Sequence, residues 1–454
     1  MAKLICYGGA GNTTGANFML EFESPSHKLG MMRVLIDCGM QQGGEAAHAH
    51  NNKRFEYDPA TVDILFVTHA HIDHIGLIPK LVRSGFKGEI YSTKETRDLA
   101  QLLLLDAAKI GRANEEVLYT PDDIEKSLTL WHALQYHEPR DFQDFTLELF
   151  NAGHILGSSM FKFTFPSGKT MLFTGDLGNS PSSLLPDVER VGGLDFLLIE
   201  SVYGDRNHED RELREEKFKR IVAESIARSG ALLIPAFSLE RIQEILATLD
   251  NLFESKEIPA VPVYLDSPLA QKITVVYERA GKFFNNQVQT ELERGDDLFK
   301  FKNLHEIGRV EESRAIAGVK GPKIIVAGSG MSTAGRIVGH EAEYLPDPKS
   351  TILFMGYQAA GTLGRQIEEG IKKVVIDDQV VEVHATVEKI TGFSGHADSD
   401  ALVDFASESE KTLQKVLVAM GEPRSSIFLA QRLRDELNLN AVATEEGKSY
   451  EIDV

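Results

Sequence analysis

Three histidines and an aspartate lie within six residues of one another: His69, His71, Asp73 and His74. The preceding run Ile64–Val67 is short, apolar and β-rich, so it predicts a buried strand with these side chains in the loop at its end. Residues two apart in an extended segment point the same way, so the first two histidines can converge on one ion. The aspartate and the last histidine can then face a second ion. These donors suit Zn²⁺, with Mn²⁺ and Fe²⁺ left open, and a polar turn with solvated histidines is the alternative.

Further ligand-type residues follow other predicted strands in the same way. Asp37 ends the run Val34–Ile36, Asp176 comes shortly after Thr170–Phe173, and His154 lies between two β-rich segments. A carboxylate beside a metal site can orient a ligating histidine by a hydrogen bond, which is the role we expect of Asp37, with an Asx turn as the alternative. Taken singly, the other two fit a core histidine and a turn aspartate equally well.

Composition limits the class of protein. A chain of 454 residues is long for one core, so two domains are expected. The formal net charge of −20 argues against whole-surface binding to nucleic acid but allows a local basic groove. The two cysteines, Cys6 and Cys38, cannot build a disulfide framework. This favours a reducing cytoplasm, with both cysteines packed as small core residues. The N-terminus lacks a signal-peptide stretch and no run approaches a membrane helix, so no membrane role is expected.

Periodicity places helices and strands around these motifs. Amphipathic periods predict helices across 94–134. After a strand that ends in Glu200, helical segments at 211–227 and 241–253 alternate with strands, which predicts a parallel α/β unit inserted into the first domain.

The motifs resemble a known family. His-x-His-x-Asp-His after a buried strand is similar to the signature of the metallo-β-lactamase fold, a four-layer αββα hydrolase. The insert resembles that of the β-CASP group, RNA-processing nucleases related to the cleavage and polyadenylation endonuclease and to bacterial and archaeal β-CASP ribonucleases. The segments that carry this resemblance are 234–241, 263–270, 327–331, 355–365 and 391–398. It implies an α/β chain with a metallo-β-lactamase domain in two parts, 1–207 and 385–454, and an inserted β-CASP domain, 208–384.

The resemblance also implies roles for single residues. Its first metal would be held by His69, His71 and His154, with Asp176 bridging, and its second by Asp73 and His74. Glu200 and His396 match the group's acid and histidine motifs, in which the histidine protonates the departing oxygen and the glutamate orients it. Asp73 is counted with this pair as catalytic. A metal-activated water would then hydrolyse RNA and leave a 5′-phosphate and a 3′-hydroxyl.

One position departs from the family pattern. Where the group has a histidine before Gly-Glu that completes the shell of the second metal, this chain has Met420. A neutral thioether binds Zn²⁺ poorly, so the second site should be weak. Three outcomes are open: a water takes the place, another histidine such as His384 substitutes, or the site holds one metal.

Residues for substrate contact are less well marked. Ser329 and Ser394 lie in Ser/Gly-rich loops that can present hydroxyls and N–H groups to phosphates. Arg336 and Arg365 are candidates for phosphate contacts, with solvated arginines as the alternative. His340 resembles a family position near the cleft.

The sequence therefore predicts a zinc-dependent ribonuclease acting on single-stranded RNA, endonuclease or exonuclease. A hydrolase of small phosphodiesters or other esters is one alternative. A low-activity RNA-binding scaffold subunit is another, although such a protein should have lost more ligands. A homodimer is left open.

Overall fold

A computed structural model of the chain describes residues 1–113, 117–209, 211–295, 297–356, 358, 361–390 and 392–454. These form two compact units, unit 1 with Met1–Asn207 and His396–Val454, and unit 2 with His208–Gly395. Parts of two expected motif segments, Tyr357, Ala359, Ala360 and Thr391, lie outside the described residues.

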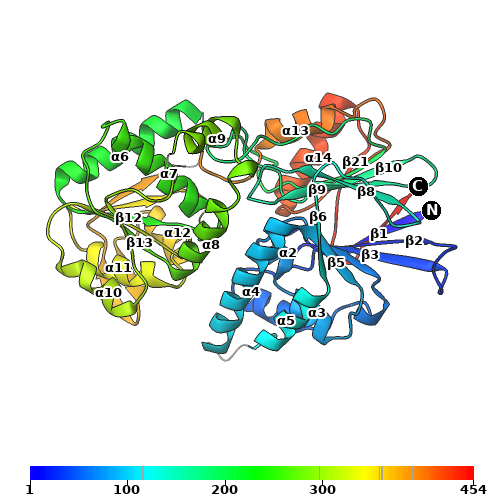
Figure 1. Cartoon of the computed structure of the whole chain (residues 1–454), viewed down its shortest axis with the longest axis horizontal. Helices are drawn as coiled ribbons and strands as arrows, with labels where there is room; N and C mark the ends of the chain where they lie inside the picture. The colour runs from blue at the N-terminus through cyan, green and yellow to red at the C-terminus, as the bar shows by residue number, and fades with distance from the viewer. Residues whose placement is uncertain (114–116, 210, 296, 357, 359–360, 391) are drawn as a thin grey trace. The chain divides into compact units, whose positions relative to one another are not determined.

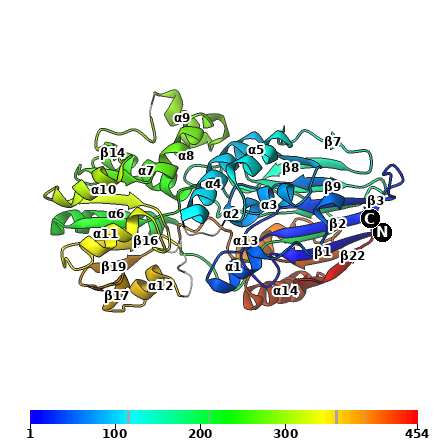
Figure 2. The same ribbon diagram turned by 90° about the horizontal axis from the view of Figure 1, so that it is seen from below.

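Unit 1 is built on two seven-stranded sheets. In spatial order the first contains β22 (Ser449–Ile452), β1 (Ala2–Gly8), β2 (Asn17–Glu23), β3 (Met31–Ile36), β4 (Ile64–Phe66), β5 (Glu89–Thr93) and β6 (Trp131–Leu134). The second contains β21 (Ala441–Ala443), β20 (Lys415–Val418), β11 (Phe196–Ile199), β10 (Thr170–Phe173), β9 (Ser159–Thr164), β8 (Thr146–Asn151) and β7 (Arg140–Asp141). Because β1 pairs with β22, the two termini lie side by side (Figure 2).

The sheets of unit 1 face each other across an aromatic core. Phe66 of β4 is fully buried, and its ring centroid lies 5.6 Å from those of Phe161 and Phe163 in β9. Both cysteines, Cys6 and Cys38, are free and buried, as expected. Burial of this aromatic surface from both sheets is the main force holding the layers together.

Helices cover the outer faces of both sheets and complete the four-layer αββα arrangement of unit 1 (Figure 1). On the side of the first sheet lie α1 (Glu45–Asn52), α2 (Ile72–Ile75), α3 (Ile78–Arg83), α4 (Lys94–Ala113) and α5 (Pro121–Thr129). On the second sheet lie α13 (Ser399–Ser407) and α14 (Pro423–Leu437). The helical prediction for 94–134 is wrong at its end, because Trp131–Leu134 pairs with β5 as a sheet strand.

Unit 2 is a parallel six-stranded sheet, as the sequence predicted for the insert. Its order is β14 (Leu304–Glu306), β13 (Val263–Asp266), β15 (Lys323–Ala327), β12 (Ala231–Pro235), β16 (Thr351–Phe354) and β19 (Thr386–Lys389). Its helices are α6 (Arg211–Arg228), α7 (Arg241–Glu254), α8 (Pro268–Glu278), α9 (Asn286–Glu293), α10 (Val310–Ala315), α11 (Arg336–Tyr344) and α12 (Leu363–Glu368). Because every residue of β12 and β15 is buried, both faces of the sheet are covered.

The units divide later in the chain than the expected boundary at 384/385. Strand β19 follows that boundary and pairs with β16, so it belongs to the sheet of unit 2. The hairpin of β17 (Lys373–Ile376) and β18 (Gln379–Glu382) precedes it. None of the described helices has the length and apolar character that a membrane crossing requires.

Candidate metal centre

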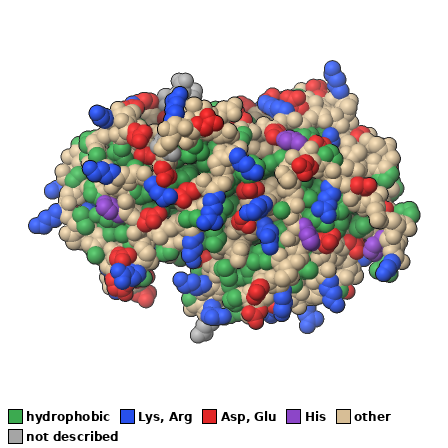
Figure 3. Space-filling view, in the orientation of Figure 1, with side chains coloured by type: hydrophobic (Ala, Val, Ile, Leu, Met, Phe, Trp, Pro, Cys, Tyr) green, Lys and Arg blue, Asp and Glu red, His purple; other side chains and the backbone are tan. Residues whose placement is uncertain are grey.

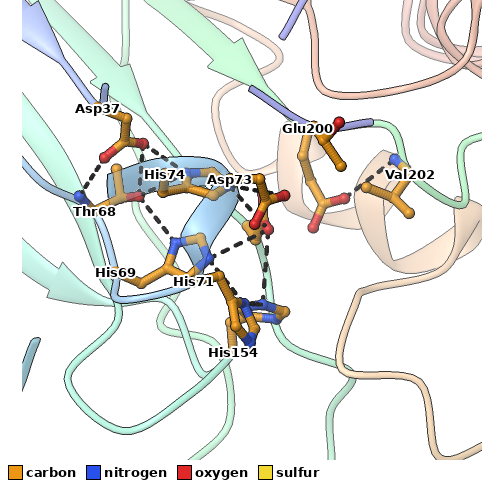
Figure 4. Close-up of polar contacts among 12 residues, drawn as sticks. Asp37, Thr68, His69, His71, Asp73, His74, His154, Glu200 and Val202 are labelled. Atoms are coloured by element: carbon orange, nitrogen blue, oxygen red, sulfur yellow. Dashed lines mark hydrogen bonds and ion pairs between the residues drawn. The ribbon is translucent and has the colours of Figure 1, made fainter. Parts of the chain in front are cut away.

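The loop after β4 is held against the segment that follows β3. The Cys38 N–H donates to the carbonyl oxygen of His74 at 2.9 Å. A Cβ on Gly39 would lie 1.5 Å from the carbonyl oxygen of Asp73, so only glycine allows this approach. The single turn of α2 carries Asp73 and His74 into the site (Figure 4).

Four side chains have donor atoms spaced as ligands of one ion. His69 Nε2 and His154 Nε2 each lie 3.1 Å from His71 Nδ1. Asp176 Oδ2 lies 3.5 Å from His69 Nε2 and 3.7 Å from His154 Nε2. Ligands about 2.0–2.1 Å from a tetrahedral ion lie about 3.3 Å from one another. All four donor atoms lie within 4.8 Å of one another, so the set fits one divalent ion.

A second set of donors shares Asp176. Its Oδ2 lies 3.3 Å from His74 Nε2, which in turn lies 4.0 Å from Asp73 Oδ2. Within the part of the chain that the structure describes, His74 Nε2 and Asp176 Oδ1 are buried atoms without a hydrogen-bond partner. Such atoms are costly unless something binds them. Bound divalent ions would satisfy both atoms, so the residues fit the metal chemistry that their types predicted.

Asp37 lies behind the ligands and holds them. Its Oδ2 lies 2.8 Å from His74 Nδ1, and its two oxygens accept hydrogen bonds from the backbone N–H and the hydroxyl of Thr68, both at 2.8 Å. Thr68 Oγ1 also lies 3.0 Å from His69 Nδ1 (Figure 4). The sequence did not single out Thr68, although a hydroxyl directly before the first histidine was the available signal. Contacts of this kind fix ring orientation in metal sites.

Glu200 and His396 meet beside Asp176. His396 Nδ1 lies 3.3 Å from Glu200 Oε1 and 3.9 Å from Asp176 Oδ2. Glu200 accepts backbone hydrogen bonds from Leu177 at 2.7 Å and Val202 at 3.2 Å, so its carboxylate is fixed. The structure thus places the pair, which is separated by 196 residues, next to the candidate ligands.

Burial and charge act in opposite directions at the site. Burial lowers the pKa of His69 well below its usual range and raises that of Asp73 to about 6. Burial opposes charge on His74 as well, but the carboxylates of Asp176 and Asp37 outweigh it and raise its pKa. Burial raises the pKa of Glu200.

Two charges at the site are nevertheless favoured. Burial works against ionisation of His396, but the neighbouring Glu200 raises its pKa to about 9. Burial also works against the Asp176 carboxylate, and His74 and His69 hold its pKa well below the usual range. The centre therefore pairs a stabilised carboxylate with imidazoles from several strand ends.

Met420 lies beside this centre. It follows β20, is 3% exposed, and lines a cavity together with Asp37, His74 and Glu200. Its N–H donates to the carbonyl oxygen of Gly9 at 2.6 Å, and a Cβ on Gly9 would lie 2.5 Å from the Met420 sulfur. The thioether therefore fills space between the end of β1 and the loop after β4 that carries His74.

In unit 2, the two candidate arginines have protein partners. Arg336 Nη1 lies 2.5 Å from Asp266 Oδ1, and its Nη2 donates to the Gly308 carbonyl oxygen at 2.7 Å. Arg365 Nε lies 2.7 Å from the Glu369 carboxylate. Both remain predictions as phosphate contacts.

The other candidates of unit 2 differ in exposure. His340 is buried with its Nε2 2.7 Å from Asp266 Oδ2, and His384 pairs with Glu382 at 2.9 Å. Ser329 is hydrogen-bonded to Thr333 at 3.0 Å, and Ser394 is 9% exposed.

A four-layer αββα unit with clustered imidazoles and carboxylates at one edge defines a metal-dependent hydrolase of the metallo-β-lactamase type. Family models agree: the metallo-β-lactamase superfamily matches residues 33–227, the Beta-Casp domain matches 242–367, and the Zn-dependent metallo-hydrolase RNA specificity domain matches 380–444.

Curated relatives show the group. The chain is 35% identical to ribonuclease TTHA0252 of Thermus thermophilus, over 95% of this chain and 96% of that protein. It is 33% identical to the transcription termination factor FttA of Pyrococcus abyssi, over 90% of this chain and 66% of the factor. The chain belongs to the β-CASP group of the metallo-β-lactamase family. A solved protein of unknown function from Enterococcus faecalis shares the fold, with a TM-score of 0.53 at 11% identity and 99% coverage of both chains.

Proposed function

We propose that this chain is a zinc-dependent ribonuclease that hydrolyses phosphodiester bonds of single-stranded RNA and leaves 5′-phosphate and 3′-hydroxyl ends. The observation that carries the proposal is the meeting at one centre of six candidate ligands with a separate acid–base pair. The ligands are His69, His71, Asp73, His74, His154 and Asp176, and the pair is Glu200 with His396. A cytoplasmic location is part of the proposal, since both free cysteines are buried and unpaired with each other.

The donor set supports zinc in the first site. Three imidazoles and a carboxylate at tetrahedral spacing are typical of Zn²⁺, while Mn²⁺ and Fe²⁺ also accept such ligands. When bound, divalent ions lower the pKa of coordinated water and stabilise charge on phosphoryl oxygens.

The chain's own residues supply the proton and its orientation. Glu200 is fixed by two backbone N–H groups and binds His396 through Nδ1, so the imidazole is held in one orientation, and we assign it the protonation of the departing oxygen. Asp37 and Thr68 fix the rings of His74 and His69 in turn.

Met420 makes the second site the weaker one in this proposal. Asp73, His74 and Asp176 remain as its ligands, and the buried thioether beside them offers Zn²⁺ only a soft, neutral donor. We propose that a water takes the ligand place that a histidine at position 420 would have filled, because His384 already pairs with Glu382 in unit 2.

RNA as substrate is supported by the RNA specificity model and the ribonuclease relative. The net charge is −20, and basic and acidic side chains are interspersed on the face drawn in Figure 3. Phosphate binding should therefore depend on the metal ions and on local contacts more than on a general positive field.

The test is cleavage of end-labelled single-stranded RNA by the purified chain with added Zn²⁺ or Mn²⁺, with analysis of the product ends. His396→Ala should lower the rate by about 10²–10⁴-fold, the range typical of a lost proton-transfer group. His305→Ala is the matched control, because this histidine is exposed on β14 of unit 2.

Two results would replace the proposal with an alternative. Hydrolysis of bis(p-nitrophenyl) phosphate without cleavage of RNA would make the chain a small-phosphodiester hydrolase. Metal-loaded chain that binds RNA and leaves it intact would be a scaffold subunit.

A further inference from the structure

Phe237 presents an aromatic ring to solvent at the carboxyl edge of the sheet in unit 2. Phe237 is 45% exposed, and it is the only exposed phenylalanine, tyrosine or tryptophan among the residues of unit 2 that the structure describes. Phe237 follows β12, the strand that lies between β15 and β16 in the sheet. Single exposed apolar side chains are common on protein surfaces, so the support of this ring and the groups beside it decide what it can bind.

The ring rests on the loop that follows β15. A Cβ on Gly330 would lie 2.7 Å from Cδ2 of Phe237 and 3.0 Å from its backbone nitrogen, so only glycine leaves room for the ring there. The Phe237 carbonyl oxygen accepts a hydrogen bond from the Ile242 N–H at the start of α7. The ring is thus supported on one side and open on another.

Buried amides fix both loops before any ligand arrives. Gln243, fully buried, donates through Nε2 to the Ser238 carbonyl oxygen at 3.3 Å. Gln358, 1% exposed, donates to the Gly330 carbonyl oxygen at 2.9 Å. A ring mounted in this way loses little conformational freedom on binding, which favours affinity.

Hydroxyl groups lie in the loops that hold the ring. Ser238 Oγ lies 3.2 Å from Ser267 Oγ, and a Cβ on Gly328 would lie within 3.8 Å of both. Ser329 and Thr333 form an exposed hydroxyl pair, 3.0 Å apart, in the loop on which the ring rests. Hydroxyls both donate and accept, so they suit ribose and phosphate oxygens without selecting a base.

We propose that Phe237 is a stacking platform for one unpaired RNA base, with the neighbouring serine hydroxyls contacting the sugar and phosphate. The proposal rests on the ribonuclease function proposed above and names a contact for its substrate. Every base has a π-face, so an aromatic platform binds single strands with little sequence preference. A base held in a duplex stack could not reach it.

The test uses the full-length, metal-loaded chain in a His396→Ala background, which slows cleavage during binding measurements. Phe237→Trp adds a fluorophore; the natural chain has only Trp131, which is buried. The probes are a 12-nucleotide oligoadenylate and an abasic ribose-phosphate strand of equal length. Stacking predicts quenching of the new tryptophan by oligoadenylate and not by the abasic strand.

A second variant measures affinity. Phe237→Leu should weaken oligoadenylate binding about tenfold and leave abasic binding unchanged, because leucine keeps the apolar contact with the loop but loses the π-face. Phe428→Leu is the matched control, since Phe428 of α14 is 48% exposed. It should change neither affinity.

Two results would overturn the stacking proposal. These are equal quenching by both strands and unchanged oligoadenylate affinity in Phe237→Leu. If the oligomeric state of that variant also changed, the ring would be a contact between copies. If the natural chain cleaves RNA while either result holds, only the stacking proposal is wrong. If the natural chain neither binds nor cleaves RNA, the proposed function is wrong as well.

Discussion

Replacing Glu341 by glutamine should change how the stability of unit 2 depends on pH. Glu341 lies on α11 and its side chain is fully buried. One carboxyl oxygen accepts a hydrogen bond from Ser332, and the other has no hydrogen-bond partner among the described residues. Burial raises the pKa of this carboxyl to about 8 from an ordinary value of 4.5.

The direction of the effect follows from proton binding. Between pH 4.5 and about 8 the folded chain keeps the proton on Glu341 while the unfolded chain loses it. Because the folded state then binds more protons, the free energy of unfolding falls as the pH rises, by up to about 1.4 kcal/mol per unit. From pH 5.5 to pH 7.5 the loss from this one group is about 2–3 kcal/mol.

Glu341→Gln removes this titration and keeps the shape of the side chain. We expect the stability of the variant relative to the natural chain to rise by about 2–3 kcal/mol between pH 5.5 and pH 7.5. Urea unfolding, with hydrogen exchange of the backbone amides of α11 as the probe, measures this difference within unit 2. Glu343→Gln is the control, because Glu343 lies on the same helix and is exposed. Parallel pH profiles for Glu341→Gln and the natural chain would refute the reasoning.

Three further predictions concern the metal centre. Asp37→Asn removes the charge that orients His74, so it should weaken ion binding about 10–100-fold in zinc titration calorimetry, and unchanged affinity would contradict that role. Met420→His should raise the zinc bound per chain toward two, measured by elemental analysis; two tightly bound ions in the natural chain would show that Met420 costs nothing. Gly39→Ala should destabilise unit 1 by about 1–3 kcal/mol in thermal unfolding, because its Cβ would collide with the Asp73 carbonyl, and an unchanged midpoint would exclude that contact.

The local part of the candidate site could be predicted because it depends on spacing alone. His69 to His74 lie on one loop after one strand, so residue types and strand prediction were enough. Asp176 and His154 needed the family resemblance, because periodicity does not say which strand ends meet. Thr68 was missed because a threonine at a strand end has many ordinary roles.

Other features depend on tertiary pairing that the sequence does not display. Residues 131–134 form a strand only because β5 offers an edge to pair with. Asp266, the partner of Arg336, lies 70 residues away at the end of β13, while Arg336 begins α11. The sequence gives the arginine a charge, but only the fold shows that a buried carboxylate neutralises it.

Strand direction explains how distant segments build one centre. Strands β3 and β4 are parallel neighbours in the first sheet, and β10, β11 and β20 are parallel in the second, so their carboxyl ends share an edge within each sheet. Asp37, Asp176, Glu200 and Met420 each follow such an end. The place of Met420 beside the ligands is thus set by the end of β20 and by its backbone hydrogen bond to Gly9, and neither requires a particular side chain. A methionine can therefore stand where the family resemblance predicts a histidine without loss of the fold, and introducing the imidazole should alter metal occupancy and leave the folded structure intact.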